Sequence, residues 1–558
     1  MIGYITGLTE EKMKEIKESP FYAKKYAKFI AAADEWVTKE PPRIKFSEMH
    51  LVNTTGNRSI YEAAWGQYLA GVRFLSFAYG LTKDEKYIEP LADLMWNICN
   101  MESWAIPYHV KETESVDRRY RWLELVSCEV GLILGEALLF TEDVLPELVL
   151  RRVKHEVRER IIEGYKVCDN WWLRTENNWA SVCIAGVLAS YIYFGTEEEI
   201  EEQLPSMIKI ANNFLRGFDS DGCCLEGYGY WYYGFSYFCI FADLLRNYTN
   251  GKINLFDSER VHTISKFQEN CAINDTQCIT FADCDSDRFD PVRYFAHFLK
   301  KLYPDVQIPG CEPPTDNMAT IRSFVWLDPS LKDEKMDKAD SRIYSDAQWF
   351  IYRSDKYNAV CKAGCNWEFH NHNDVGSFMI SKGGRITFTD PGGGDYTRQY
   401  FDSDTRYTIL ECSARSHSVP IINGIFQKEF LSKKSTIYTA KENEYKFSME
   451  NGYVIDTLKS LTRDFLCGEE GITITDTYEF SEMPTTVVER FVSLVEPKIE
   501  VGRVIVGESI LLYDPELFDF EFSTDTCVRK KEKKDTLYIY DFKAKNLDKN
   551  MTLEFKFL

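Results

Sequence analysis

Residues 304–319 read PDVQIPGCEPPTDNMA, and this proline-rich stretch divides the 558-residue chain into two parts with different periodicity. Upstream of it, apolar residues recur at three- and four-residue spacing, which is typical of amphipathic helices. Downstream, short runs rich in β-branched and aromatic residues alternate with Gly, Asp and Asn, which is typical of antiparallel strands. Because the chain is longer than one hydrophobic core usually serves, we expect at least two domains.

The upstream part contains several long segments with helical periodicity, joined by short loops. These segments are residues 9–37, 59–81, 86–99, 128–140, 198–218 and 290–303. Successive helical hairpins favour an (α/α) toroid or a solenoid, although no repeat of fixed period is visible in the sequence. We therefore predict a helical (α/α) toroid domain over residues 1–305. Residues 179–195 are apolar but short and rich in Gly, Ala and Ser, so we expect a buried helix there.

The downstream part contains a series of short β-type runs. These are residues 348–354, 358–364, 377–381, 385–390, 453–466, 472–480, 486–494, 536–544 and 551–557. They predict an antiparallel β-sandwich over residues 341–558, with a linker and the start of the β region over 306–340. A fold of this order, first helices and then strands, places the expected binding cleft between the two domains.

The composition excludes some classes of function. A formal net charge of −21 argues against nucleic acid as a partner, although a local basic cleft can still hold an anionic substrate. No segment resembles a signal peptide or a membrane span, so we expect no membrane partner and a cytoplasmic location, or a secreted or periplasmic one if a leader was removed. The sixteen cysteines follow no repeating framework, which favours free thiols in a reducing compartment. The sequence does not indicate the oligomeric state.

Two of the eight histidines stand close together in FHNHNDVGSFMI, residues 369–380. If this stretch is extended, His370 and His372 point to the same side, about 7 Å apart. Residues 376–394 predict a β-hairpin with its turn at 382–384, which brings His372 near Asp390. His417 occupies another strand-like position. Two imidazoles and a carboxylate suit Zn²⁺ or a related divalent ion, so His372, Asp390 and His417 are one candidate set. The alternative is that these histidines are hydrogen-bonded in a turn-rich loop.

Several motifs together resemble the heparinase II/III-like polysaccharide lyases. In the β half they are YRSDKYNAVCKAG (352–364), HNHNDVGSF (370–378), TDPGGGDYT (389–397) and ARSHS (414–418). In the helical half they are WAIPYHV (104–110), ENNWASVCIAGV (176–187) and DGCCLEGYGYWYYG (221–234). The resemblance extends from about residue 100 to about residue 420, and its motifs stand in the order of that superfamily. It implies a polysaccharide lyase that cleaves a glycosaminoglycan-like, uronic-acid-containing poly- or oligosaccharide by β-elimination.

Such a reaction needs a group that stabilises the uronate carboxylate, a base for the C5 proton and an acid for the departing O4. The resemblance matches Asn178 to the neutralising amide, with Asn177 beside it, although either asparagine also suits a helix N-cap. Several lyases of this fold place a histidine after that asparagine. Trp179 occupies the position here, which removes one possible base and offers a stacking surface.

The tyrosine-rich stretch after Glu226 supplies the first acid/base candidate. Tyr230 is preferred by position, with Tyr228 and Tyr232 as neighbours, while packing beneath the toroid is the alternative for most of these tyrosines. Glu226 would orient the cluster or serve as a helix-start carboxylate.

The other implied roles fall on histidines and arginines. His370 would be the second acid/base, supported by a structural divalent metal, expected to be zinc, on His372, Asp390 and His417. His109 would line the cleft or lie in the core. Arg398 and Arg415 would hold a second carboxylate or a sulfate, or else form ordinary surface salt bridges.

Three other functions suit the same sequence. A glycoside hydrolase would use two carboxylates, with Glu226 and one of Asp283, Asp285 or Asp287 as the candidates. A uronate epimerase would abstract the same C5 proton without expelling O4. A non-catalytic glycan-binding protein would need neither Tyr230 nor His370. Only the lyase uses the Asn, Tyr and His motifs together.

Overall fold

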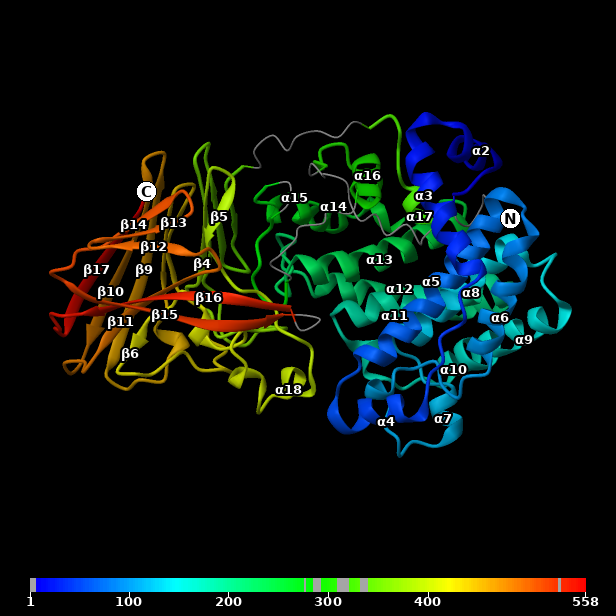
Figure 1. Cartoon of the computed structure of the whole chain (residues 1–558), viewed down its shortest axis with the longest axis horizontal. Helices are drawn as coiled ribbons and strands as arrows, with labels where there is room; N and C mark the ends of the chain where they lie inside the picture. The colour runs from blue at the N-terminus through cyan, green and yellow to red at the C-terminus, as the bar shows by residue number, and fades with distance from the viewer. Residues whose placement is uncertain (1–6, 275–276, 285–292, 309–320, 332–339, 530–532) are drawn as a thin grey trace.

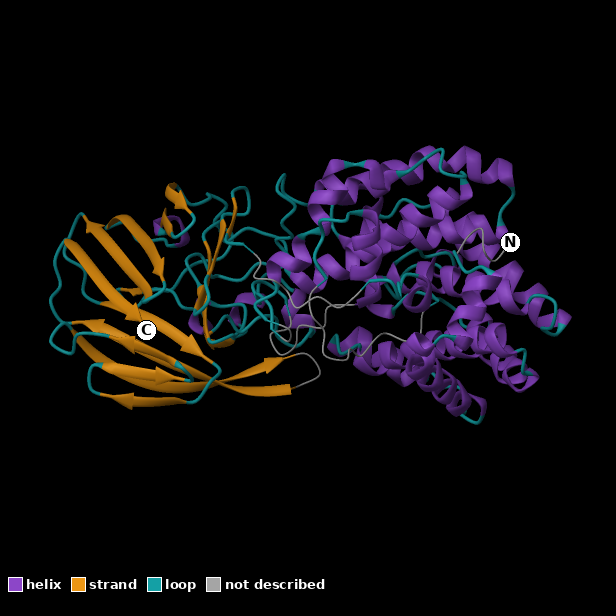
Figure 2. Cartoon of the chain, turned by 90° about the horizontal axis from the view of Figure 1, so that it is seen from above, coloured by secondary structure: helices purple, strands orange, loops and turns teal. Residues whose placement is uncertain are grey.

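The structure is a computed structural model that describes residues 7–274, 277–284, 293–308, 321–331, 340–529 and 533–558. Helices fill one part of the molecule and strands the other (Figures 1 and 2). The predicted fold class, an N-terminal helical toroid followed by antiparallel sheets, is therefore confirmed.

The helices of the described residues lie almost entirely before the first strand. They are α2 (Glu10–Glu18), α3 (Pro20–Val37), α4 (Phe46–Thr55), α5 (Ser59–Thr82), α6 (Ile88–Cys99), α7 (Val116–Tyr120), α8 (Leu125–Thr141), α9 (Glu147–Val157), α10 (Glu163–Lys166), α11 (Asn178–Phe194), α12 (Glu197–Arg216), α13 (Tyr228–Tyr248), α14 (Glu259–Ser265), α15 (Phe267–Cys271), α16 (Arg293–Leu302), α17 (Arg322–Val325) and α18 (Arg398–Phe401). None of them combines the length and the apolar content that a membrane span requires.

Local chemistry explains where the helices break. The segment predicted as one helix over 9–37 is two helices, because Ser19 ends α2 and also caps α3, whose first residue is Pro20. Proline fits the first turn of a helix, where its missing N–H costs no hydrogen bond, but it disrupts a helix interior.

Helix α11 is the expected buried helix. Apolar residues surround it on almost every side, so it lies within the helical core against α8, α12 and α13. Gly186 sets how closely α8 and α11 approach, since an added β-carbon there would stand 2.1 Å from the carbonyl oxygen of Cys128. This close packing fixes the position of the N-terminus of α11, from which Asn177 and Asn178 project.

The strands form three antiparallel sheets. They are β1 (Arg342–Tyr344), β2 (Trp349–Arg353), β3 (Tyr357–Lys362), β4 (Phe378–Lys382), β5 (Arg385–Phe388), β6 (Ile421–Ile422), β7 (Ile437–Lys441), β8 (Glu444–Ser448), β9 (Leu458–Gly468), β10 (Gly471–Phe480), β11 (Val487–Ser493), β12 (Pro497–Glu500), β13 (Arg503–Val506), β14 (Ser509–Leu512), β15 (Phe518–Arg529), β16 (Lys533–Ala544) and β17 (Asn550–Phe557). The orders are β1-β2-β3-β4-β5, β12-β13-β14-β17-β10-β9-β8-β7 and β15-β16-β11-β6.

The five-stranded sheet joins the two halves of the molecule. On β2, Trp349 and Ile351 pack into the core of the helices, while Phe350 and Tyr352 pack into the core of the other sheets. Successive side chains of a strand point to opposite faces, so this sheet is buried on both sides. It therefore holds the helical half and the outer sheets in one arrangement.

The predicted hairpin forms from β4 and β5. Gly383 and Gly384 both have positive φ, 57° and 76°, which a tight two-residue turn of this hand requires. The boundary regions differ from expectation in one respect: α17 lies within 306–340, which was expected to be linker and the start of the β region. Residues 309–320 and 332–339 of that predicted linker lie outside the described residues.

Candidate active site

A cavity of about 840 Å³ lies where the helical half meets the loops of the five-stranded sheet. Six residues proposed from the sequence line it: His109, Asn177, Asn178, Trp179, Tyr230 and His370. These residues come from both halves of the chain, so the cavity corresponds to the cleft expected between the two domains. Residues not proposed for a lyase site also contribute to its wall, among them Arg58, Asp283 and Tyr396.

The two adjacent asparagines play different structural parts. Asn177 is the N-cap of α11, and its side-chain oxygen accepts a hydrogen bond from the backbone N–H of Trp179 at 3.2 Å. Asn178 is the first residue of the helix, and its side chain lies in the cavity wall with no hydrogen-bond partner among the described residues. The helix N-terminus also favours a negative group nearby. The amide of Asn178 is therefore available to bind an anionic ligand.

Tyr230 lies on the first turns of α13 and faces the loop that carries His370. Its ring stacks on the His370 ring with centroids 4.1 Å apart, and its hydroxyl is 2.9 Å from the hydroxyl of Tyr396. Burial and the charge of Asp283 raise the pKa of Tyr230 above its ordinary value of 10. The phenol therefore holds its proton at neutral pH, which suits an acid rather than a base.

His370 does not lie in an extended strand, so the conformation from which we expected it and His372 to point to one side is absent, although both rings reach the same carboxylate. It occupies a turn with a φ of +54°, a conformation that histidine adopts more readily than most residues. The turn aims both imidazoles at a single carboxylate. Nδ1 of His370 and Nε2 of His372 both contact Asp283, the latter at 3.0 Å. The other nitrogen of His370 is 3.4 Å from Oε2 of Glu226.

Asp283 is the buried centre of this arrangement. Besides the two histidines, it accepts hydrogen bonds from the hydroxyl of Tyr400 and from Nη2 of Arg406, the latter at 2.9 Å. Burial favours its neutral form, but Arg406 and the histidines outweigh that effect and hold its pKa well below the ordinary value. Sequence reasoning considered Asp283 only as a hydrolase carboxylate, because no motif links it to residues about ninety positions away.

A second group of polar residues contributes to the cavity wall. His109 is 2.7 Å from Oε2 of Glu124 through Nδ1 and 3.3 Å from Nη1 of Arg58 through Nε2. Its ring also packs against Trp179 at 4.7 Å. Arg58, which the sequence analysis missed, is the N-cap residue of α5 and pairs with Glu62 at 3.0 Å. It brings a guanidinium group to the cavity beside His109.

Three of the proposed residues from the tyrosine-rich stretch lie behind the cavity wall. Glu226 is buried and contacts His370 from behind, where burial raises its pKa. Tyr228 stacks on Trp231 at 5.7 Å within the helical core, and Tyr232 bonds to the hydroxyl of Tyr294 at 3.1 Å. The alternative considered for these tyrosines, packing beneath the toroid, describes their positions.

The two proposed arginines also lie away from the cavity wall. Nη2 of Arg398 donates to the backbone oxygen of Asn53 at 2.8 Å, which ties the loop of α18 to α4. Nη2 of Arg415 donates to the backbone oxygen of Thr408 at 2.9 Å. Both arginines therefore stabilise loops, and neither lines the cavity.

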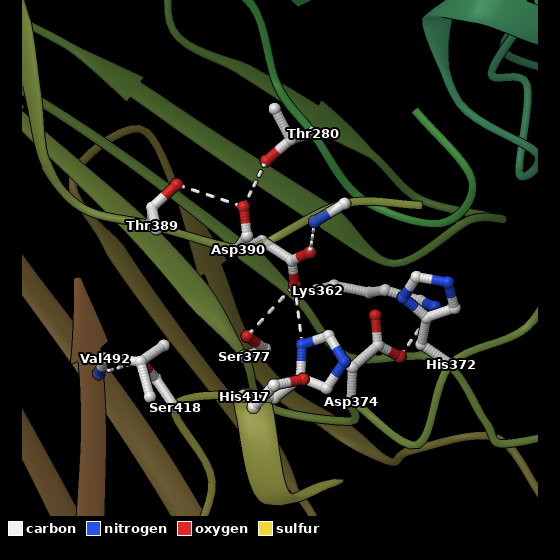
Figure 3. Close-up of polar contacts among 12 residues, drawn as sticks. Thr280, Lys362, His372, Asp374, Ser377, Thr389, Asp390, His417, Ser418 and Val492 are labelled. Atoms are coloured by element: carbon white, nitrogen blue, oxygen red, sulfur yellow. Dashed lines mark hydrogen bonds and ion pairs between the residues drawn. The ribbon is translucent and has the colours of Figure 1, made fainter. Parts of the chain in front are cut away.

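The predicted metal ligands fall into two candidate groups. Figure 3 shows Asp374, Asp390 and His417, with His372 nearby. Asp390 and His417 lie together, with Nδ1 of His417 at 2.9 Å from Oδ2 of Asp390, and the third member of their cluster is Asp374. His372 is grouped instead with Asp283 and Cys412. His372 therefore lies apart from its predicted partners in these candidate groups, because its contact with Asp283 draws that imidazole to the other one. The rings of His372 and His417 remain neighbours, with centroids 5.4 Å apart.

The donor atoms of this region suit a divalent cation. Nδ1 of His372 and Oδ2 of Asp374 are buried and have no hydrogen-bond partner among the described residues. Nε2 of His417 contacts the backbone oxygen of Glu411 at 3.0 Å, and Nε2 of His372 contacts Asp283. Metal-binding histidines usually direct their second nitrogen to such an acceptor. A positive charge that would oppose a bound cation is also present, because Nζ of Lys362 lies 2.9 Å from Oδ1 of Asp374.

Comparison with known proteins finds one matching family model and several solved structures of similar fold. Residues 336–554 match the family model described as heparinase II/III-like, C-terminal. A search of curated protein sequences found no match. A mutant heparan sulfate lyase HepC from Pedobacter heparinus superposes with a TM-score of 0.64 at 13% identity, over 98% of this chain and 90% of that one.

Two further solved structures have the same architecture. A heparinase III superposes with a TM-score of 0.63 at 14% identity, over 98% of this chain and 90% of that one. A chondroitin AC lyase from Streptomyces coelicolor A3, in complex with chondroitin sulphate, gives 0.58 at 9% identity, over 98% and 82%. At these identities the likeness establishes a shared fold.

Proposed function

We propose that this chain is a polysaccharide lyase of the heparinase II/III-like superfamily, because residues 336–554 match that family model and the fold is shared with solved lyases. Its substrate would be a uronic-acid-containing, glycosaminoglycan-like poly- or oligosaccharide, cleaved by β-elimination. One observation carries the proposal: an amide, a phenol and an imidazole, from Asn178, Tyr230 and His370, line the same cavity.

Asn178 would bind the uronate carboxylate. Its amide donates hydrogen bonds without titrating, and it lies at the positive end of α11. Charge that develops on the carboxylate as the C5 proton leaves is stabilised there by a preorganised donor. Arg58 offers a further positive group in the same cavity, and His109 an imidazole beside it.

His370 would act as the base and Tyr230 as the acid. Nδ1 of His370 is engaged by Asp283, so the C5 proton would go to Nε2, with Oε2 of Glu226 3.4 Å away to stabilise the imidazolium that forms. The C5–H electron pair forms the C4–C5 double bond, the C4–O4 bond breaks, and the phenol of Tyr230 gives its proton to O4. Its raised pKa supports this assignment, because the phenol arrives at the reaction protonated. Asp283 would be a positioning residue that fixes the tautomer of His370.

We further propose that Asp374, Asp390 and His417, with His372 beside them, hold a structural divalent metal, with zinc the expected ion. When bound, the metal would cross-link the loops that carry these residues. The loop of Asp374 also carries His370 and His372, and His372 contacts Asp283. Order in this loop would therefore support the catalytic groups.

The other functions are less well supported by the contacts. Asp283, a carboxylate proposed for a hydrolase, is fully engaged by Arg406, Tyr400 and the two histidines, and the His370 ring lies between it and Glu226. Asp285 and Asp287, the other hydrolase candidates, lie outside the described residues. An epimerase would use the same groups and is distinguished by its product.

An absorbance screen tests the proposal. The protein is incubated with heparan sulfate, hyaluronan, chondroitin and alginate, and β-elimination is expected to produce an unsaturated uronate end that absorbs near the ultraviolet edge. New reducing ends without that absorbance would indicate a hydrolase. Solvent deuterium at C5 without chain cleavage would indicate an epimerase. Binding without turnover would indicate a glycan-binding protein.

A further inference from the structure

We propose that aromatic side chains beside the cavity form a second carbohydrate subsite, which we call the aromatic platform. Its members are Phe430, the two rings that pack against it, Trp367 and Tyr407, and the exposed Phe369, which stands two residues after Trp367 in the chain. The subsite would stack against sugar rings of an acidic polysaccharide that extend out of the cavity past His370. This inference rests on the proposed function, because it assigns the platform to the same substrate chain.

The platform presents an unusual amount of aromatic surface to solvent. Trp367, Phe369 and Phe430 are exposed by 59%, 57% and 44%. The rings of Trp367 and Phe430 are 5.2 Å apart at 70°, and those of Tyr407 and Phe430 are 5.5 Å apart at 89°. Clustered exposed apolar surface usually marks an interaction site, whereas single exposed residues do not.

The platform is held rigidly. The backbone N–H of Asn366 donates to the oxygen of Leu431 at 3.0 Å, and the N–H of Phe430 donates to the oxygen of Asn366 at 2.9 Å. The buried amide of Asn366 also donates to Gln427 and to the oxygen of Lys428, each at 3.1 Å. These bonds join the loop of Trp367 to the loop of Phe430.

Backbone strain indicates that the outward position of Phe430 has a use. Its φ is +64°, in the left-handed region that bulky residues rarely occupy. Such strain persists where the surrounding structure enforces it, and it is concentrated at functional sites. A polar residue or glycine would relieve the strain, yet an aromatic ring is placed in solvent here.

The platform is joined to the cavity wall by short chain segments around His370. Phe369 directly precedes His370, and Trp367 lies three residues before it, so the α-carbon of Trp367 is within about 11 Å of that of His370. The amide of Asn371, directly after His370, donates to the hydroxyl of Tyr407 at 3.4 Å. A saccharide that leaves the cavity beside His370 therefore meets this surface within a few sugar units.

The charge of the loop that carries Phe430 favours an acidic polymer as the occupant. Residues 428–434 read KEFLSKK, a net charge of +2 in a chain of net charge −21. Lys428 and Lys433 are exposed. A second copy of this strongly acidic protein would be repelled at long range, whereas uronate carboxylates would be attracted to these lysines. An acidic polysaccharide suits both the rings and the charges.

The test compares long and short substrates. For the polymer that the wild-type protein cleaves fastest, kcat/KM is measured on the intact polymer and on a tetrasaccharide prepared from it. Trp367→Ala and Phe430→Ala are expected to lower the polymer-to-tetrasaccharide ratio about tenfold, because only the long chain reaches the platform. Phe522→Ala is the matched control, since Phe522 is 40% exposed on β15, outside the platform. Its ratio should stay that of the wild type.

Binding is measured separately from cleavage. Affinity electrophoresis of the Tyr230→Phe protein in gels containing the same polymer should show less retardation when Trp367→Ala is added. An unchanged ratio and unchanged retardation in a wild-type background that cleaves the polymer would overturn the platform and leave the lyase intact. Retardation that depends on Trp367 without any cleavage would overturn the lyase instead. Loss of a dimer in Trp367→Ala, seen by light scattering, would identify a self-association surface and overturn the inference.

Discussion

The sharpest test of the proposed chemistry is Tyr230→Phe. This change removes one hydroxyl group and keeps the ring that stacks on His370 at 4.1 Å. If Tyr230 is the general acid, kcat should fall by about 10²–10⁴, which corresponds to about 3–5 kcal/mol of transition-state stabilisation. The free energy of unfolding should change by only about 1 kcal/mol, because the variant loses one hydroxyl–hydroxyl bond, to Tyr396.

Tyr396→Phe is the matched control. It removes the same 2.9 Å bond from the other side and leaves the phenol of Tyr230 in place. Both variants are assayed by the absorbance of the unsaturated uronate product, and their folding is checked by thermal denaturation. We expect Tyr396→Phe to lose less than about tenfold in kcat. Equal losses of kcat in the two variants would show that the hydrogen bond between the two hydroxyl groups, rather than proton donation by Tyr230, supports the reaction.

The pH dependence tests which proton Tyr230 moves. Its pKa is raised above 10 by burial and by Asp283, so the phenol stays protonated up to about pH 9 in the free enzyme. An acid needs that protonated form, so kcat should show no alkaline loss from Tyr230 below pH 9. A base would need the phenolate, and kcat would then rise about tenfold per pH unit toward pH 10. Such a rise in the wild type, absent in Tyr230→Phe, would refute the assignment.

Further predictions concern the asparagines, a buried carboxyl group and the metal. Asn178→Ala should lower kcat by about 10²–10³ with little change in Tm, whereas Asn177→Ala should mainly cost about 1 kcal/mol of stability as a lost N-cap; the reverse pattern would exchange their roles. Burial raises the pKa of the Glu269 carboxyl group from 4.5 to about 7. The protonated carboxyl group therefore gives its full contribution to the free energy of unfolding below pH 4.5, and this contribution is lost as pH rises through 7. At 1.36 kcal/mol per pH unit, the lost free energy is about 3 kcal/mol. Glu269→Gln should therefore flatten the fall in Tm between pH 5 and pH 8, and an unchanged fall would contradict this. Elemental analysis should find about one zinc per chain, and a chelator should lower the Tm of the wild type but not that of Asp390→Asn.

Local patterns in the sequence were enough for the fold class. Helical spacing upstream of residue 304 and β-type runs downstream predicted helices followed by sheets, and the turn at 382–384 was found where two glycines supply it. These features depend on residues within a few positions of one another, which is the range over which periodicity and turn chemistry act. Asn178, Tyr230 and His370 could be proposed from motifs for the same reason, since each lies in a short recognisable stretch.

Only the tertiary structure decided how these groups are paired. Asp283 binds His370 and His372 across almost ninety residues, and Tyr396 reaches Tyr230 across 166. The replacement of His372 by Asp374 in the candidate metal group and the position of Arg58 beside His109, 51 residues away, also depend on long-range packing. A buried charge or hydroxyl group takes whichever partner the packing brings within about 3 Å, and packing is a property of the whole fold. Sequence therefore determined which chemical groups were available, and the fold determined which of them meet.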